Sequence, residues 1–222
     1  MKKTLLAGAL LAGFSLTTQA TLFVTGWTNG VNASFANSGL VPDNNFSGWV
    51  DSHTISTAPG GTVTSVTVDL VLAGGWNGDL YAFLVNGSGF SVLLNHVGGA
   101  ANGGYGNAGN GFNVQLSDSG ASGLHNYTGN GAGVLTGAWQ ADGAGFGSFI
   151  GLNPNSTWSL FIADTSAGGI SAVQSWGLQL DIVAVPEVET WVAAALAGMF
   201  GAFWLNRQIM SGVKKVSQSP PL

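Results

Sequence analysis

Hydrophobic and polar residues alternate along several stretches of the chain. In the segment TVTSVTVDLVLAG, residues 62–74, every second residue from Val66 to Leu72 is apolar. A period of two is typical of a β-strand with one buried face. Residues 79–86 and 90–97 follow turns rich in Gly and Asn, which tolerate the positive φ of tight turns. We therefore expect consecutive antiparallel strands here.

The same alternation returns further along the chain. Residues 157–164 (TWSLFIAD) and 172–183 (AVQSWGLQLDIV) repeat large apolar residues at every second position, and we expect Trp158 and Trp176 to be core residues. The short connection TSAGGIS predicts a hairpin between the two segments. Residues 98–147 are rich in Gly, Asn and Ala, which favours long loops with one or two short strands. The pattern predicts an all-β fold, a jelly-roll-like β-sandwich.

Composition supports this fold class. The 36 glycines among 222 residues, with only 7% charged residues, disfavour helices. The chain has no cysteine, so the stability of the sandwich comes from its core, with or without a bound metal. We expect one domain over residues 21–183, a length that buries a sizeable core.

The charges are distributed unevenly. The basic residues all lie near the two ends: Lys2, Lys3, Arg207, Lys214 and Lys215. From Thr21 to Val185 there are eight aspartates and no glutamate, lysine or arginine, a net charge of −8. Phosphate backbones repel such a body, so we expect no nucleic-acid partner, whereas cations, neutral glycans and proteins stay open.

The N-terminal segment has the features of a secretory signal peptide, residues 1–20. Two lysines precede an apolar stretch at residues 5–16, and small residues precede the predicted cleavage site between Ala20 and Thr21. An uncleaved anchor helix is the alternative. We expect export of the body.

The C-terminal segment follows the charge rules of a membrane segment. After residues 184–189 comes an apolar run at residues 190–205, and a basic tail at residues 206–222 contains Arg207. The 16-residue run is about 24 Å long as a helix, against an apolar core of about 30 Å. We expect a short transmembrane helix that Arg207 stops in the membrane, with the tail on the cytoplasmic side. A permanent anchor and a buried core helix are the alternatives.

Three segments resemble the P domain (Homo B domain) of kexin-type proprotein convertases. They are WNGDLYAFLV, SFIGLNPNSTWSLFIADTSAGG and SAVQSWGLQL, and the resemblance covers residues 62–183. The matching motif positions are Gly78-Asp79-Leu80, Ser156-Thr157-Trp158-Ser159-Leu160 with Asp164, and Ser175-Trp176-Gly177-Leu178. Ser156 stands where that family has a turn glycine. The resemblance implies a β-sandwich that accompanies a secreted serine protease.

The segment VPEVETW, followed by the apolar run and arginine, resembles the PEP-CTERM sorting signal of exopolysaccharide-producing bacteria. The resemblance implies that exosortase, a membrane transpeptidase, recognises Pro186 and Glu187 and releases the protein. The protein would then be held transiently in the membrane before it reaches the cell surface or the biofilm matrix. Val188 stands where that family often has a second proline.

Catalytic motifs are missing from the sequence. It has no cysteine nucleophile, no Gly-x-Ser-x-Gly, no His-Glu-x-x-His and no phosphate-binding loop, so we expect no enzyme. Asp79 and Asp164 are open to three roles: a hydrolytic carboxylate pair, turn capping or cation binding. We name Asp79, Asp118 and Asp164 as candidate calcium ligands, because calcium prefers carboxylate and backbone oxygens. The histidines at 53, 96 and 125 lack metal-ligand spacing and are interpreted as surface or loop residues.

Four tryptophans beside glycine-rich or polar stretches are candidates for stacking on a sugar or for partial burial under loops. They are Trp27, Trp49, Trp76 and Trp139. The leading hypothesis is a non-enzymatic exported protein with a structural or adhesive role and no required cofactor, in contact with exosortase and an exopolysaccharide. The alternatives are a carbohydrate-binding module and an accessory P domain of a secreted serine protease.

Overall fold

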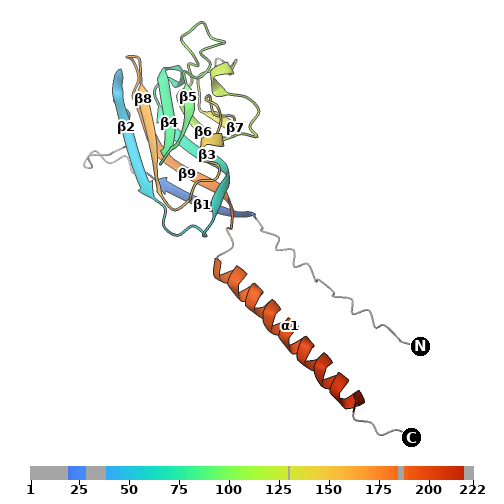
Figure 1. Ribbon diagram of the computed structural model, residues 1–222. Coiled ribbons are helices and arrows are strands. Elements are labelled where there is room, and N and C mark those ends of the chain that lie inside the picture. The colour runs from blue at the N-terminus through green and yellow to red at the C-terminus, as the bar shows by residue number, and fades with distance from the viewer. Residues whose placement is uncertain (1–19, 29–38, 130, 185–187, 218–222) are drawn as a thin grey trace. The chain divides into compact units, whose positions relative to one another are not determined.

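The computed structural model describes residues 20–28, 39–129, 131–184 and 188–217, which form two β-sheets and one α-helix. One sheet, sheet A, has the strand order β1-β9-β3-β6-β7, and the other, sheet B, has the order β2-β8-β4-β5. The two sheets form the two layers of a sandwich (Figure 1). The strands are β1 (Ala20–Thr28), β2 (Asn45–Thr54), β3 (Thr62–Gly74), β4 (Leu80–Asn86), β5 (Gly89–Asn95), β6 (Gly111–Ser117), β7 (Leu135–Trp139), β8 (Thr157–Asp164) and β9 (Ser171–Val183).

The core lies between the two sheets and follows the alternation of the sequence. In β3 and β9 the inward side chains, from Val66 to Leu72 and from Trp176 to Ile182, are at most 3% exposed. Trp158 of β8 is fully buried. These strands form because each places large apolar side chains at every second position, which only a pleated strand can turn to one side. The all-β prediction is confirmed.

Two predicted pairings are wrong. The segments that form β8 and β9 do not make a hairpin, because β8 pairs with β2 and β4 in sheet B whereas β9 pairs with β1 and β3 in sheet A. Similarly, β3 does not pair with β4, although β4 and β5 are antiparallel neighbours as expected. In both errors the connection crosses from one layer to the other. A strand pattern shows which side chains are buried, but both layers bury their inner faces in the same core.

The glycine-rich region between β5 and β8 contains β6 and β7, which pair in parallel. Three single-turn 3-10 helices, at Asn77–Asp79, Leu124–Asn126 and Gly147–Phe149, lie in the connections. The prediction of long loops with short strands is confirmed for this region.

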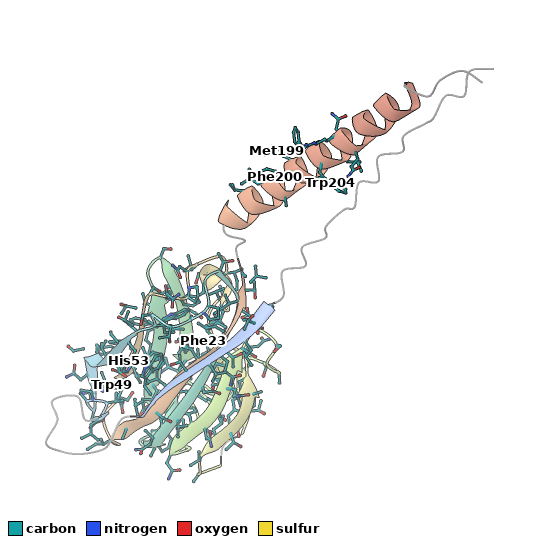
Figure 2. The ribbon with its side chains drawn as sticks, turned by 90° about the horizontal axis from the view of Figure 1, so that it is seen from below. Phe23, Trp49, His53, Met199, Phe200 and Trp204 are labelled. Carbon is teal, nitrogen blue, oxygen red and sulfur yellow. The ribbon has the colours of Figure 1, made fainter. Side chains whose placement is uncertain are left out.

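The helix α1 (Val188–Ser217) is longer than the apolar run at residues 190–205. Its second half includes most of the predicted tail at residues 206–222, because good helix formers such as Arg, Gln, Met and Lys continue the helix there. Met199, Phe200 and Trp204 project from α1 and are 60–71% exposed (Figure 2). Within the described residues, no helix has both the length and the apolar character that crossing a membrane needs. The predicted transmembrane helix is therefore not supported.

The chain separates into two compact units between Ala184 and Val185, the sandwich on one side and α1 on the other.

Candidate functional site

A hollow of about 910 Å³ lies where the β3–β4, β5–β6 and β8–β9 connections meet. Connections at one end of a rigid sandwich are a common place for binding residues. The volume is within the usual range of ligand sites. The residues that line the hollow are Trp76, Asp79, Asn102, Tyr105, Gly106, Ala108, Ser166, Ala167 and Gly168.

Two aromatic rings at this hollow are open to solvent. Trp76 is 40% exposed and Tyr105 is 82% exposed. The indole Nε1 of Trp76 donates a hydrogen bond of 3.0 Å to the backbone carbonyl of Tyr105, which holds the tryptophan against the opposite loop. The hollow thus presents a fixed tryptophan and a freely exposed tyrosine.

A buried amide network fixes the two loops below these rings. The Asn77 side chain donates to Asn107 Oδ1 at 3.0 Å and to the Gly111 carbonyl at 3.1 Å, and it accepts from the Gly111 amide at 2.8 Å. Gly78 adds a steric requirement, because a Cβ there would lie 2.4 Å from the carbonyl oxygen of Tyr105. The β3–β4 and β5–β6 connections are therefore joined by the hydrogen bonds of the Asn77 amide, and their close approach requires the absence of a side chain at Gly78.

Carboxylates lie at one side of the hollow. Asp79 is half-buried, and burial raises its pKa, while a hydrogen bond from the Ser166 side chain and the nearby His96 oppose this shift. Asp164 is fully buried, and its pKa is raised mainly by burial, with further contributions from the negative charges of Asp79 and Asp43. One oxygen of Asp164 accepts the Ser166 amide at 3.2 Å, and the other has no partner.

The predicted calcium ligands are not brought together. Asp79 and Asp164 are close enough to influence each other electrostatically, but Asp118 caps a different turn, where its Oδ1 accepts the Phe146 amide at 2.9 Å. The third carboxylate that acts electrostatically on Asp79 and Asp164 is Asp43, which the sequence analysis did not name as a candidate. Within the described residues, no three His, Cys, Asp or Glu side chains form a group that can hold a metal.

The hydrolytic carboxylate pair also lacks the geometry it needs. In a pair that cleaves a glycosidic bond, both carboxyl groups must reach the substrate. Asp79 lines the hollow, but Asp164 is 0% exposed, so it cannot touch a bound ligand. The buried Asp164 caps the turn at Ser166 instead.

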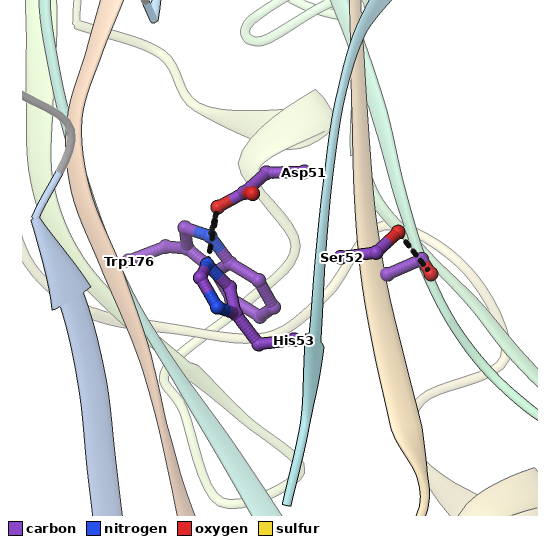
Figure 3. A network of polar contacts seen from close by, with 5 residues as sticks. Asp51, Ser52, His53 and Trp176 are labelled. Carbon is purple, nitrogen blue, oxygen red and sulfur yellow. Dashed lines mark hydrogen bonds and ion pairs between the residues drawn. The ribbon is translucent and has the colours of Figure 1, made fainter. Parts of the chain in front are cut away.

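A second polar cluster lies on β2, where Asp51, Ser52 and His53 are the three residue types of a catalytic triad in consecutive positions. Asp51 Oδ2 accepts the Trp176 indole at 2.9 Å and contacts His53 Nε2 at 2.8 Å (Figure 3). The Ser52 side chain points to the opposite face of the strand, where its hydroxyl bonds Ser159 at 2.8 Å. The serine is therefore separated from the histidine by the strand itself, as expected for neighbours in a β-strand.

This cluster joins the edges of the two sheets. The His53 ring stacks on Trp27 of β1 with centroids 4.4 Å apart and planes 7° apart, and Trp27 in turn contacts Trp176 at 4.5 Å. His53 is thus a half-buried strand residue, whereas the sequence predicted a surface or loop histidine. His96 and His125 do lie in connections, where their Nδ1 atoms bond backbone carbonyls.

The tryptophans separate into distinct roles. Trp158 and Trp176 are core residues, as predicted. Trp49 is only 6% exposed, so it cannot stack on a ligand, and Trp139 lies edge-on against Tyr127 at 5.4 Å. Of the four candidates for sugar stacking, Trp76 alone lines the hollow.

The predicted processing sites are mostly outside the described residues. Residues 1–19, Pro186 and Glu187 lie there, so the signal peptide and the sorting motif stay predictions. Ala20 begins β1, where it pairs with Val183. Arg207 lies exposed on α1.

The chain matches no family model and no curated protein sequence. Among solved structures it is similar to the serine protease of Aeromonas sobria, with 16% identity and a TM-score of 0.45, over 77% of this chain and 28% of that one. It is also similar to the complex of that protease with its chaperone, with 15% identity and a TM-score of 0.45, over 75% of this chain and 28% of that one. A similarity of this size concerns the course of the backbone and says nothing of activity or partner.

Proposed function

We propose that the chain is an exported, non-enzymatic binding protein whose ligand is a neutral carbohydrate held in the hollow at the loop end of the sandwich. One observation carries the proposal: the exposed rings of Trp76 and Tyr105 stand beside a carboxylate, an amide and a hydroxyl in one concave site. An aromatic ring offers its face to the apolar C–H face of a sugar, and the polar groups suit its hydroxyls. This role is the carbohydrate-binding module that the sequence analysis names as an alternative to the structural or adhesive role.

The electrostatics of the body disfavour an anionic ligand. Between Thr21 and Val185 all charged side chains are aspartates, so an anionic ligand is repelled. A neutral glycan meets no such repulsion. The exopolysaccharides of a surrounding matrix include ligands of this chemical class, and export rests on the N-terminal signal in the sequence.

The polar lining supports the same ligand class. Asp79 accepts the Ser166 hydrogen bond, and the Asn102 side chain donates to the Tyr127 carbonyl at 3.4 Å. These bonds hold the two polar groups at the hollow before a ligand arrives, which lowers the entropic cost of binding. A carboxylate accepts hydroxyl protons, and an amide both donates and accepts, so together they complement a sugar hydroxyl pair.

The test is electrophoresis of the full chain through gels that contain hydroxyethyl cellulose, xyloglucan, galactomannan or dextran. We expect at least one polysaccharide to retard the protein. Trp76→Ala and Tyr105→Ala should each weaken that retardation about two- to tenfold, the range for losing one aromatic contact. Val134→Ala, which changes an apolar side chain that is 55% exposed, is the matched control. Unchanged retardation in both ring variants, with unchanged melting temperatures, would contradict the proposal.

A further inference from the structure

The outer faces of the two sheets differ in chemistry. On sheet A the outer side chains of β3 and β9 form polar pairs, in which Gln179 donates to Asp69 at 2.8 Å and Ser65 donates to Asp181 at 2.6 Å, and the exposed apolar side chains of this face are Leu22 and Val24 of the edge strand β1. Such a polar, solvated outer face is what an antiparallel sandwich normally shows. The outer face of sheet B departs from this rule.

Aromatic and aliphatic side chains cross the outer face of sheet B in register. One row runs over all four strands as Val50, Phe161, Phe83 and Val92. The rings of Phe83 and Phe161 stack with centroids 4.5 Å apart and planes 16° apart. Phe90 adds a third ring 5.2 Å from Phe83, and Phe90 and Val50 are each 49% exposed.

Paired hydroxyls lie beside this row. Ser52 bonds Ser159 at 2.8 Å, and one step further along the strands Thr54 bonds Thr157 at 2.8 Å. Because strand partners on one face are spaced by two residues, these pairs continue the same surface. The outer face of sheet B therefore combines stacked rings with a border of neutral hydroxyls.

Within the described strands of sheet B, no aspartate, glutamate, lysine, arginine or histidine has its side chain on this face. The strands of sheet B contain three such residues, and each turns away from it. Asp51 and His53 contact Trp176 of the other sheet, and Asp164 is fully buried. This face therefore offers no charged side chain with which a ligand could form an ion pair, and the anionic body around it repels anionic partners.

We infer that the outer face of sheet B is a second binding surface, on which an extended neutral glycan lies across the Phe161–Phe83–Phe90 rings. The ligand class rests on the proposed function, but the surface is separate from the hollow. Pyranose rings have an apolar face and a hydroxyl rim, which match the aromatic row and the serine and threonine pairs. A second copy of the chain fits less well, because two bodies of the same −8 charge repel each other.

The experiment uses the same four polysaccharide gels and the full chain. Phe90→Ser, at the half-exposed edge, and Phe83→Ser, at the centre, should each weaken retardation about two- to tenfold, and Val134→Ser serves as the control. Phe90→Ser keeps the test valid where Phe83→Ser fails to fold, since Phe90 contributes less to buried packing. The melting temperature of each variant confirms that it is folded.

The outcomes separate the two surfaces. If the phenylalanine variants lose retardation and Trp76→Ala keeps it, the result would support binding at the outer face of sheet B and contradict binding in the hollow. Loss with Trp76→Ala alone would overturn the inference and leave the proposed function standing. Retardation by no polysaccharide would overturn both. Sedimentation of the wild-type chain as a dimer that Phe90→Ser makes monomeric would also overturn the inference, because the face would then be an interface between copies.

Discussion

Replacing Asp51 by alanine tests the bridge between the two sheet edges. The Trp176 indole is 2% exposed and donates its single N–H to Asp51 at 2.9 Å. In the variant that N–H stays buried without an acceptor, which lowers the free energy of unfolding by about 1–3 kcal/mol. The contact of His53 with Asp51 adds at most about 1 kcal/mol, because the histidine side chain is 31% exposed.

The expected change is measurable by calorimetry. For a domain of this size each kcal/mol lowers the melting temperature by about 2–4 °C, so the combined loss from Asp51→Ala should lower it by about 2–16 °C. The sharper measurement is a double-mutant cycle with Trp176→Phe, which removes the N–H and keeps most of the ring. If the hydrogen bond carries the effect, Asp51→Ala should cost much less in the Trp176→Phe background. If the stability losses of the two single variants add up to that of the double variant within about 0.3 kcal/mol, the hydrogen bond does not carry the effect.

Three further predictions concern other parts of the chain. Gly78→Ala should destabilise the fold and disturb the hollow, because its new Cβ would lie 2.4 Å from a backbone oxygen, whereas Gly60→Ala, with no atom within 4 Å, should be neutral in the same melts. Asp164 has a raised pKa in the folded state, so the folded protein binds its proton more tightly than the unfolded chain does. Stability should therefore increase as the pH falls from neutrality toward 3.8, and Asp164→Asn should reduce this gain; an identical pH dependence in the variant would count against the shift. Finally, N-terminal sequencing of the exported protein should begin at Thr21, and a sequence that begins at Met1 would disprove cleavage.

Local alternation was enough to find most of the strands. The segments that became β3, β4, β5, β8 and β9 were recognised because their inward positions are apolar, and burial of Trp158 and Trp176 followed from the same period. The missed strand β2 shows the limit of that signal. Two of its inward positions are Asp51 and His53. Their partial burial is possible because Asp51 accepts a hydrogen bond from the Trp176 indole and His53 stacks on the Trp27 ring, both on the other sheet.

Strand pairing was decided by the tertiary structure. The pattern of β8 and β9 is the same whether they are neighbours in one sheet or opposite each other in two, since both arrangements bury the same faces. The sequence therefore predicted a hairpin where the chain crosses between layers. The helix α1 likewise extends through the predicted tail, because helix propensity and not the end of the apolar run sets its boundary.

The candidate binding surfaces were visible in the sequence only in part. Trp76 and Asp79 could be named from their glycine-rich context, but Tyr105 and Ser166 join them through loops distant in the chain. The aromatic row of sheet B was hidden for a related reason. Phe83 and Phe161 occupy the outer face of their strands, and a lone outward phenylalanine in a sequence does not indicate a binding surface. Only the register of β8 against β4 places the two rings in contact, so sequence determined the strands and the register of the folded sheet determined the surface.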